Sequence, residues 1–169
     1  MGRVVSQDEL ILHRGEWKRN GKRVVFASGC FDLLHPGHIR LIEQARANGD
    51  VLIVGIESDE TASGHQSAAS ASESAAAQRP LTPAAERAEV VAALAAVDYA
   101  VELNTATTRT LLAQLAPDVV VKGGDPGSDQ AAFQADEAST IAGSKVVRIP
   151  LEPGHSTARL IERIKNLSA

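Results

Sequence analysis

Residues 23–56 read RVVFASGCFDLLHPGHIRLIEQARANGDVLIVGI, and this stretch decides the fold. Two compact apolar runs, residues 23–28 and 51–56, are each bounded by Gly or Asp and are typical of buried parallel strands. Between them, residues 39–45 carry apolar side chains at nearly helical spacing, and an Asn-Gly pair then ends the helix. The stretch therefore predicts a strand, a helix and a second strand, which together form a βαβ unit.

The rest of the chain continues this alternation. Ser6 and Glu9 predict a capped N-terminal helix within residues 1–20. Further helices are predicted over residues 83–96, 107–115 and 156–167, and further strands over residues 99–103, 119–122 and 145–149. Five strands alternating with helices predict an α/β protein with a doubly wound, Rossmann-like, parallel five-stranded sheet and helices on both faces.

Residues 63–78 depart from the pattern. They are rich in Ala and Ser and contain no large apolar side chain, so they offer little surface to bury. We expect a mobile surface loop there. The length of 169 residues suits one domain, so we expect residues 1–169 to form a single domain.

Charge and cysteine content narrow the function classes. A formal net charge of -4 provides no overall attraction for nucleic acid or anionic lipid, so we expect neither partner, and an anionic ligand needs a local site. Cys30 is the only cysteine, which excludes an internal disulfide and a Cys-x-x-Cys metal site. The sequence has no run of about 18 apolar residues, which a membrane-spanning helix requires. We expect a cytoplasmic protein, and we expect no resident metal.

The loop after the first predicted strand, residues 28–38, is the strongest candidate for a site, because open α/β sheets bind ligands at the carboxyl ends of their strands. Gly29 permits a tight turn, and Gly37 lets a ligand approach the start of the next helix, where free N–H groups attract phosphate. His35 and His38 lie one turn apart there, so both can donate to charge that develops on one phosphate. The loop matches neither G-x-G-x-x-G nor the G-x-x-x-x-G-K-[ST] phosphate loop.

With His35-Pro36-Gly37-His38 after this strand, the chain resembles the cytidylyltransferase-like nucleotidyltransferases, whose signature is H-x-G-H. The resemblance implies that His35 and His38 are catalytic: they contact a nucleoside triphosphate and stabilise the transition state at its α-phosphorus. It also implies that no covalent enzyme intermediate forms. The residues just before the motif, Gly29, Cys30 and Phe31, are then expected to bind nucleotide together with Gly37.

Motifs farther along the chain resemble one branch of that family, the D-glycero-β-D-manno-heptose 1-phosphate adenylyltransferases. They are Arg79-Pro80, Glu86-Arg87, Ala96-Val97-Asp98-Tyr99, Val121-Lys122-Gly123-Gly124-Asp125 and Gly154-His155-Ser156-Thr157. The resemblance implies transfer of AMP from ATP, bound with Mg²⁺, to a heptose 1-phosphate, which gives ADP-heptose and pyrophosphate. It implies a form without the kinase domain that some members carry, and it leaves room for a homodimer.

Within the fourth motif, Lys122 ends a predicted strand, where its ammonium group can bind phosphate. A lysine at the end of a strand can also simply be exposed to solvent. The resemblance adds Lys122 to the catalytic residues, and it places Gly124 and Asp125 at the nucleotide. A turn-stabilising role explains Asp125 equally well.

Ser156 and Thr157 open the last helix, where helix capping and phosphate binding both explain Ser156. The resemblance implies that Ser156 and Thr157 bind nucleotide, and His155 occupies a variable position of that motif. Asp32, Arg79 and Arg87 are the candidates for substrate binding, by hydrogen bonds to sugar hydroxyls or by guanidinium contacts to phosphate. Arg87 has an alternative role, pairing with an acid such as Glu57 to brace the site.

Two features leave alternatives open. Residues 60–78 contain no Lys or Arg, whereas related enzymes carry lysine there, so a catalytically weakened nucleotide-binding module is one alternative. The other is a cytidylyltransferase for glycerol 3-phosphate or another small alcohol phosphate. Those enzymes typically have an arginine where this chain has Leu151, which favours ATP over CTP.

Overall fold

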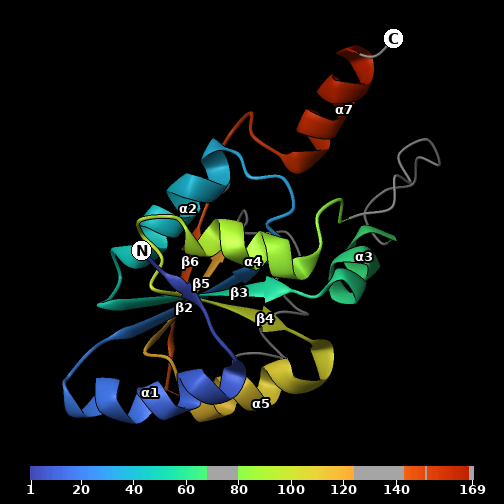
Figure 1. Ribbon diagram of the computed structural model, residues 1–169. Helices are drawn as coiled ribbons and strands as arrows, with labels where there is room; N and C mark the ends of the chain where they lie inside the picture. Colours follow the sequence, from blue (N-terminus) through green and yellow to red (C-terminus); the bar gives the residue numbers. More distant parts are fainter. Residues whose placement is uncertain (68–79, 124–142, 151, 168–169) are drawn as a thin grey trace.

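The computed structural model describes residues 1–67, 80–123, 143–150 and 152–167. Their strands form one parallel sheet in the order β1-β4-β3-β2-β5-β6 (Figure 1). The strands are β1 (Arg3–Val4), β2 (Val24–Gly29), β3 (Val51–Glu57), β4 (Tyr99–Leu103), β5 (Val119–Gly123) and β6 (Lys145–Ile149). The helices are α1 (Gln7–Arg19), α2 (Pro36–Arg46), α3 (Asp59–Ser67), α4 (Ala84–Ala92), α5 (Thr105–Leu115) and α7 (Thr157–Leu167).

Helices cover both faces of the sheet, as the doubly wound prediction requires (Figure 1). On one face α2 and α4 bury Ile42 and Val91, and on the other α1 and α5 bury Leu10 and Leu111. Alternate residues of each central strand enter the two cores, since side chains along a strand point to opposite faces. This explains why the central strands are continuous apolar runs.

The sheet has six strands rather than the predicted five. The additional strand, β1, is two exposed residues long and forms the edge of the sheet, where it pairs with β4 through Arg3 and Tyr99. Two residues cannot show an alternating pattern, so the sequence carried no signal for this strand.

The predicted loop over residues 63–78 is wrong at its start, because residues 63–67 belong to α3. The hydroxyl of Ser58 accepts a hydrogen bond from the backbone N–H of Thr61, and Ala62 is buried. A capped first turn and one buried contact stabilise a helix that composition alone did not favour. The remainder, residues 68–78, lies outside the described residues.

The order of the strands locates the site. From β2 the chain adds β3 and β4 on one side, and it then returns to place β5 and β6 on the other side of β2. This reversal is a topological switch point, where the loops after β2 and β5 diverge and leave a crevice for ligands. Within the described part of the chain, no helix is both long and apolar enough to cross a membrane.

Candidate active site

The loop after β2 turns sharply at Phe31, whose φ of 51° lies in the left-handed region that bulky residues rarely adopt. The turn directs the Phe31 ring inward, where it is 3% exposed and lies 5.4 Å from the His38 ring, centroid to centroid. A Cβ atom on Gly29 would lie only 3.1 Å from the Phe31 ring, so a larger residue at position 29 would press on that ring. Phe31, predicted to bind nucleotide, thus supports His38 from the core.

His35 and His38 stand together at the start of α2. His35 is the N-cap residue and Pro36 follows it in the first turn. The two imidazoles stack with centroids 3.8 Å apart and planes inclined by 19°. Both Nδ1 atoms are buried and accept or donate no hydrogen bond among the described residues. Buried polar atoms are usually satisfied, so an incoming ligand is a natural partner for this pair.

Burial is the main cause that lowers the pKa of both histidines. The pKa of His38 falls to about 4, with His35 as the second cause, and the pKa of His35 is lowered further by His155. At neutral pH both rings are therefore uncharged and can each donate one N–H to an anion.

The depressed pKa of His38 makes stability depend on pH. An unfolded histidine titrates near 6.5, so between about pH 6.5 and pH 4 the unfolded chain binds more protons than the folded one. His38 thus contributes stability that is complete above about pH 6.5 and is lost as pH falls toward 4. We expect the free energy of unfolding, measured with urea at about pH 7 and about pH 5, to change less with pH in His38→Gln. His13→Gln is the control. If the free energy of unfolding of His38→Gln depends on pH as strongly as that of the wild type and of the control, the prediction is wrong.

Lys122 of β5 reaches the same end of the sheet. Its Nζ donates a hydrogen bond of 3.0 Å to Oγ of Ser28 on β2, the strand that leads into the histidine loop. The two strands of the switch point therefore bring Lys122 beside that loop, as the sequence predicts. Gly124, Asp125 and Arg79 lie outside the described residues.

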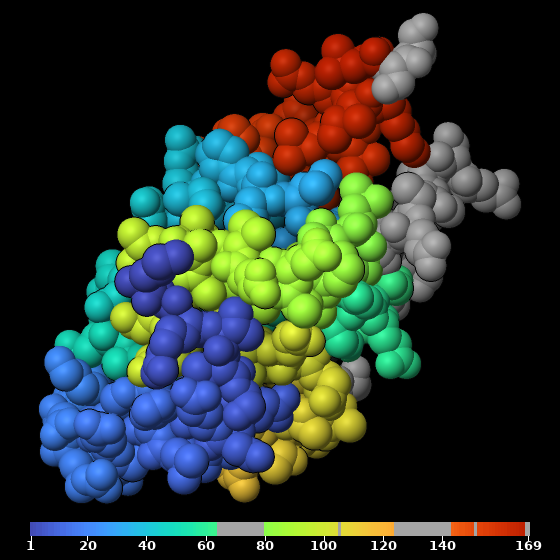
Figure 2. Space-filling view, in the orientation of Figure 1, coloured from blue at the N-terminus to red at the C-terminus, as the bar shows by residue number. Residues whose placement is uncertain are grey.

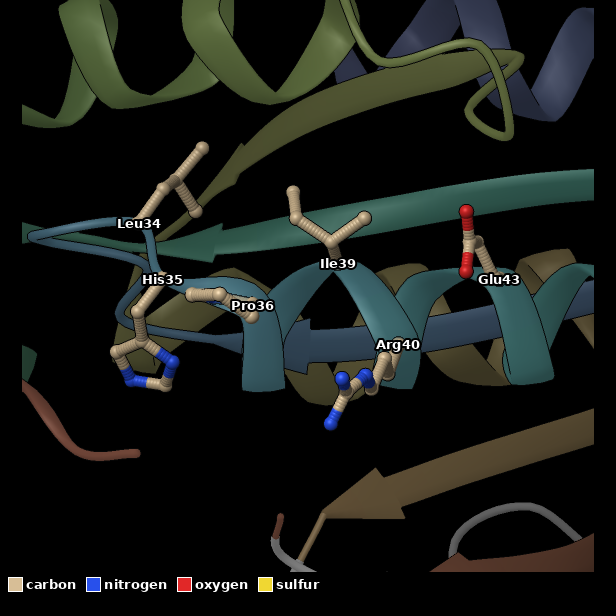
Figure 3. Close-up of a pocket in the computed structure, with 6 residues that line it drawn as sticks. All are labelled: Leu34, His35, Pro36, Ile39, Arg40 and Glu43. Carbon is tan, nitrogen blue, oxygen red and sulfur yellow. The ribbon is translucent and has the colours of Figure 1, made fainter. Parts of the chain in front are cut away.

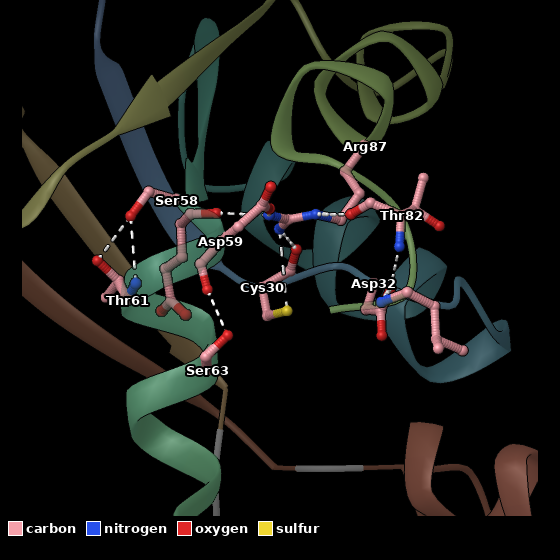
Figure 4. Close-up of polar contacts among 10 residues, drawn as sticks. Cys30, Asp32, Ser58, Asp59, Thr61, Ser63, Thr82 and Arg87 are labelled. Atoms are coloured by element: carbon pink, nitrogen blue, oxygen red, sulfur yellow. Dashed lines mark hydrogen bonds and ion pairs between the residues drawn. The ribbon is translucent and has the colours of Figure 1, made fainter. Parts of the chain in front are cut away.

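Arg87 extends from α4 beneath the loop and is 1% exposed (Figure 4). Its guanidinium donates to the backbone carbonyls of Thr82 at 2.8 Å, Glu57 at 2.8 Å and Cys30, and it pairs with the Asp59 carboxylate at 2.6 Å. This arrangement matches the alternative role of Arg87, in which it pairs with an acid to brace the site. The acid is Asp59, whereas Glu57 contributes only its backbone carbonyl. Arg87 joins the carboxyl ends of β2 and β3.

Two further loop residues have internal partners. The buried Asp32 carboxylate accepts hydrogen bonds from the backbone N–H groups of Leu81 at 2.8 Å and Thr82 at 3.1 Å. It therefore anchors the chain that leads into α4. Burial, more than the nearby charges, raises the pKa of the Cys30 thiol, so Cys30 stays a neutral thiol.

The segment before α7 lies against α2. Arg40 forms an ion pair with Glu152, and a Cβ atom on Gly37 would lie 3.3 Å from Cβ of Glu152. Ser156 caps α7, since its Oγ accepts a 3.2 Å hydrogen bond from the backbone N–H of Arg159, and Thr157 begins the helix. Sequence reasoning missed the pairing of Arg40 with Glu152, because nothing local links residues so far apart.

Two cavities flank the histidine loop. One of about 450 Å³ is lined by Leu34, His35, Pro36, Ile39, Arg40 and Glu43 along α2 (Figure 3). The other, about 280 Å³, lies between the loop, α4 and α7 and includes Asp32, Arg87 and Leu160. The described ranges contain no group of three or more His, Cys, Asp or Glu side chains that could hold a metal ion.

Known proteins with similar sequences and structures show the family of the chain. The sequence model of the family described as Cytidylyltransferase-like matches residues 26–163. The bifunctional protein HldE of Rhodopseudomonas palustris (strain BisA53) is 39% identical over 163 residues, which are 96% of this chain and 31% of that protein. HldE of Acidiphilium cryptum (strain JF-5) is 38% identical over 164 residues, 97% of this chain and 32% of that protein. The chain thus spans about a third of the length of these relatives.

Among solved structures, the lipopolysaccharide core biosynthesis protein from Thermoplasma volcanium GSS1 superposes with a TM-score of 0.64. It is 26% identical in sequence, and the match covers 78% of this chain and 99% of that chain. The family match covers most of the chain, including the histidine loop, the β5 end and the start of α7. The chain therefore belongs to the cytidylyltransferase-like family and is a nucleotidyltransferase.

Proposed function

We propose that this nucleotidyltransferase transfers AMP from ATP to D-glycero-β-D-manno-heptose 1-phosphate, giving ADP-heptose and pyrophosphate. The observation that carries the proposal is the stacked pair of uncharged histidines at the start of α2, beside Lys122 at the switch point of the sheet. Hydrogen-bond donors fixed at one place suit a reaction in which negative charge moves between phosphate oxygens.

In this reaction an oxygen of the sugar phosphate attacks the α-phosphorus of ATP in line. The new O–P bond forms as the bond between the α-phosphorus and its bridging oxygen breaks, and pyrophosphate leaves with that bond's electron pair. His35 and His38 donate N–H groups to the α-phosphate oxygens, while Lys122 offsets charge on the phosphates with its ammonium group. Catalysis is thus positioning and charge stabilisation, with no covalent intermediate on the enzyme.

Magnesium, the expected cofactor, enters this proposal as a partner of the triphosphate. Mg²⁺ retains several waters and commonly binds proteins through one or two carboxylates plus substrate phosphates, so it needs no cluster of protein ligands. Of the residues predicted near the nucleotide, Asp125 has the right chemistry for one such contact, directly or through water. The ion, when bound, neutralises charge on the leaving pyrophosphate.

The relatives support a sugar phosphate as acceptor, since one solved neighbour is named for lipopolysaccharide core biosynthesis. The HldE relatives, at 38% and 39% identity over nearly the whole chain, support the heptose branch that the motifs resemble. Because the chain spans only about a third of those proteins, the heptose substrate is our proposal. The single domain, the homodimer and the cytoplasmic location stay predictions.

We expect the enzyme to use ATP in preference to CTP. Leu151 stands where the alcohol-phosphate cytidylyltransferases typically have arginine, and the Lys122-Gly123-Gly124-Asp125 motif resembles the heptose branch. The test is pyrophosphate release from each of four nucleoside triphosphates, with a panel of sugar and alcohol phosphates as acceptors. ATP with heptose 1-phosphate should give the highest kcat/KM. A CDP-alcohol as main product would move the enzyme to the cytidylyltransferase branch, and nucleotide binding without turnover would indicate a weakened module.

A further inference from the structure

A third imidazole stands beside the histidine pair. The ring of His155 lies 6.2 Å from the ring of His35, centroid to centroid, with planes inclined by 22°. His35 is therefore the shared member of two stacked pairs, His35 with His38 and His35 with His155. The three rings come from two segments that are far apart in the sequence, so the tertiary structure brings them together.

The backbone that carries His155 is held in place. The Arg40–Glu152 ion pair joins this segment to α2, and the N–H of His155 donates a 3.3 Å hydrogen bond to the carbonyl of Glu152. Gly154 adopts a φ of 82°, a conformation that suits glycine, and so turns the chain toward α7. Figure 2 shows α7 projecting from the end of the molecule where α2 lies, so the turn stands at the edge of the site.

His155 is not needed for packing. Its side chain is exposed, and a centroid separation of 6.2 Å is far looser than the 3.8 Å between His35 and His38. His155 is nevertheless coupled electrostatically to the site, because it lowers the pKa of His35. An exposed basic ring electrostatically coupled to a catalytic residue is placed to meet a charged ligand.

The phosphates of a bound triphosphate need further hydrogen-bond donors. Residues 60–78 contain no Lys or Arg, so that stretch has no permanently charged cation to offer a triphosphate. Along the stack of rings, His155 follows His38 and His35. Its ring can donate N–H to an oxygen without help from that stretch.

We propose that His155 is a third phosphate-binding histidine, which donates a ring N–H to the β- or γ-phosphate of the bound nucleoside triphosphate. The proposal rests on the proposed function only in requiring a triphosphate substrate, and the identity of its base is immaterial. His155 thereby holds the part of the nucleotide that leaves as pyrophosphate, while His35 and His38 serve the α-phosphate.

The test separates hydrogen bonding from ring stacking. His155→Phe keeps a ring next to His35 but has no donor, whereas His155→Lys keeps donors and a positive charge but has no ring. Affinity is measured by calorimetry with Mg²⁺ and no acceptor, using the triphosphate that the wild type binds most tightly and the matching monophosphate. His13→Phe, a histidine replacement on α1, is the matched control.

We expect His155→Phe to weaken triphosphate binding about tenfold, with monophosphate binding unchanged and His155→Lys within about threefold of wild type. Wild-type affinity in His155→Phe would overturn the proposal, as would an equal loss in His155→Lys or an equal loss for the monophosphate. If the wild type prefers CTP, only the assignment of ATP fails, and the variants are compared with CTP. If the wild type binds no triphosphate, both proposals fail.

Discussion

Replacement of His35 or His38 with Ala is expected to lower kcat by a factor of about 100 or more, which corresponds to about 3 kcal/mol of transition-state stabilisation. The stacked rings present neutral donors at the start of α2, and each donor acts on charge that appears only as the α-phosphorus is attacked. Such interactions lower the barrier more than they strengthen ground-state binding. The effect should therefore fall on kcat, with a smaller change in KM for the nucleotide.

Steady-state kinetics of pyrophosphate release, with nucleotide and acceptor varied separately, measure this effect. His13→Ala is the matched control, since His13 stacks on Trp17 of α1 and belongs to the other face of the sheet. The double variant should lose little more than either single variant, because the two rings act on one phosphate as a unit. A folded double variant with nearly normal turnover would refute the assigned role of both histidines.

Replacement of Arg87 with Met should lower the free energy of unfolding by about 3 kcal/mol. The guanidinium is 1% exposed and is the donor for three backbone carbonyls, those of Cys30, Glu57 and Thr82. Methionine fills much of the space but donates nothing, so these carbonyls lose a buried partner. Because Arg87 joins the carboxyl ends of β2 and β3, the loop that carries the histidines should also be less well held, and kcat should fall.

Asp59→Asn is the matched control for Arg87→Met. The Asp59 side chain is 52% exposed, so the ion pair is screened by water and its loss should cost no more than about 1 kcal/mol. Urea unfolding of both variants gives the comparison directly. Equal losses in the two variants would show that the ion pair, rather than the carbonyl contacts, is the stabilising part of this brace. A selective rise in KM for the acceptor, with stability unchanged, would instead restore the substrate-binding role of Arg87.

Much of the fold was predictable because it is encoded locally. The apolar runs that form β2 and β3 are long enough to reveal buried parallel strands, and the helical periodicity between them identified α2. The N-cap role of Ser6 was likewise predicted and is confirmed, since its side chain accepts from the N–H of Glu9. β1 and α3 escaped prediction, since a two-residue strand and a helix that buries little show no periodicity.

By itself the sequence determined the position of the candidate site. His35 and His38 are three residues apart after a predicted strand, so any folding of that stretch as a helix places both at its first turn. The family signature adds their expected role, and the family match confirms the class of enzyme. Local spacing carries the position of the pair, and no long-range contact is needed to read it.

Only the tertiary structure decided which other side chains share the site with that pair. Arg87 binds backbone carbonyls beneath the loop, and Asp32 anchors the chain before α4, while their predicted contacts with substrate stay predictions. The strand order places Lys122 in hydrogen-bond contact with Ser28. The Arg40–Glu152 ion pair holds the segment that brings His155 next to His35. The physical reason is that an exposed and a buried arginine look alike in a sequence. Whether a polar group faces ligand or satisfies backbone carbonyls depends on packing between segments that local patterns do not record.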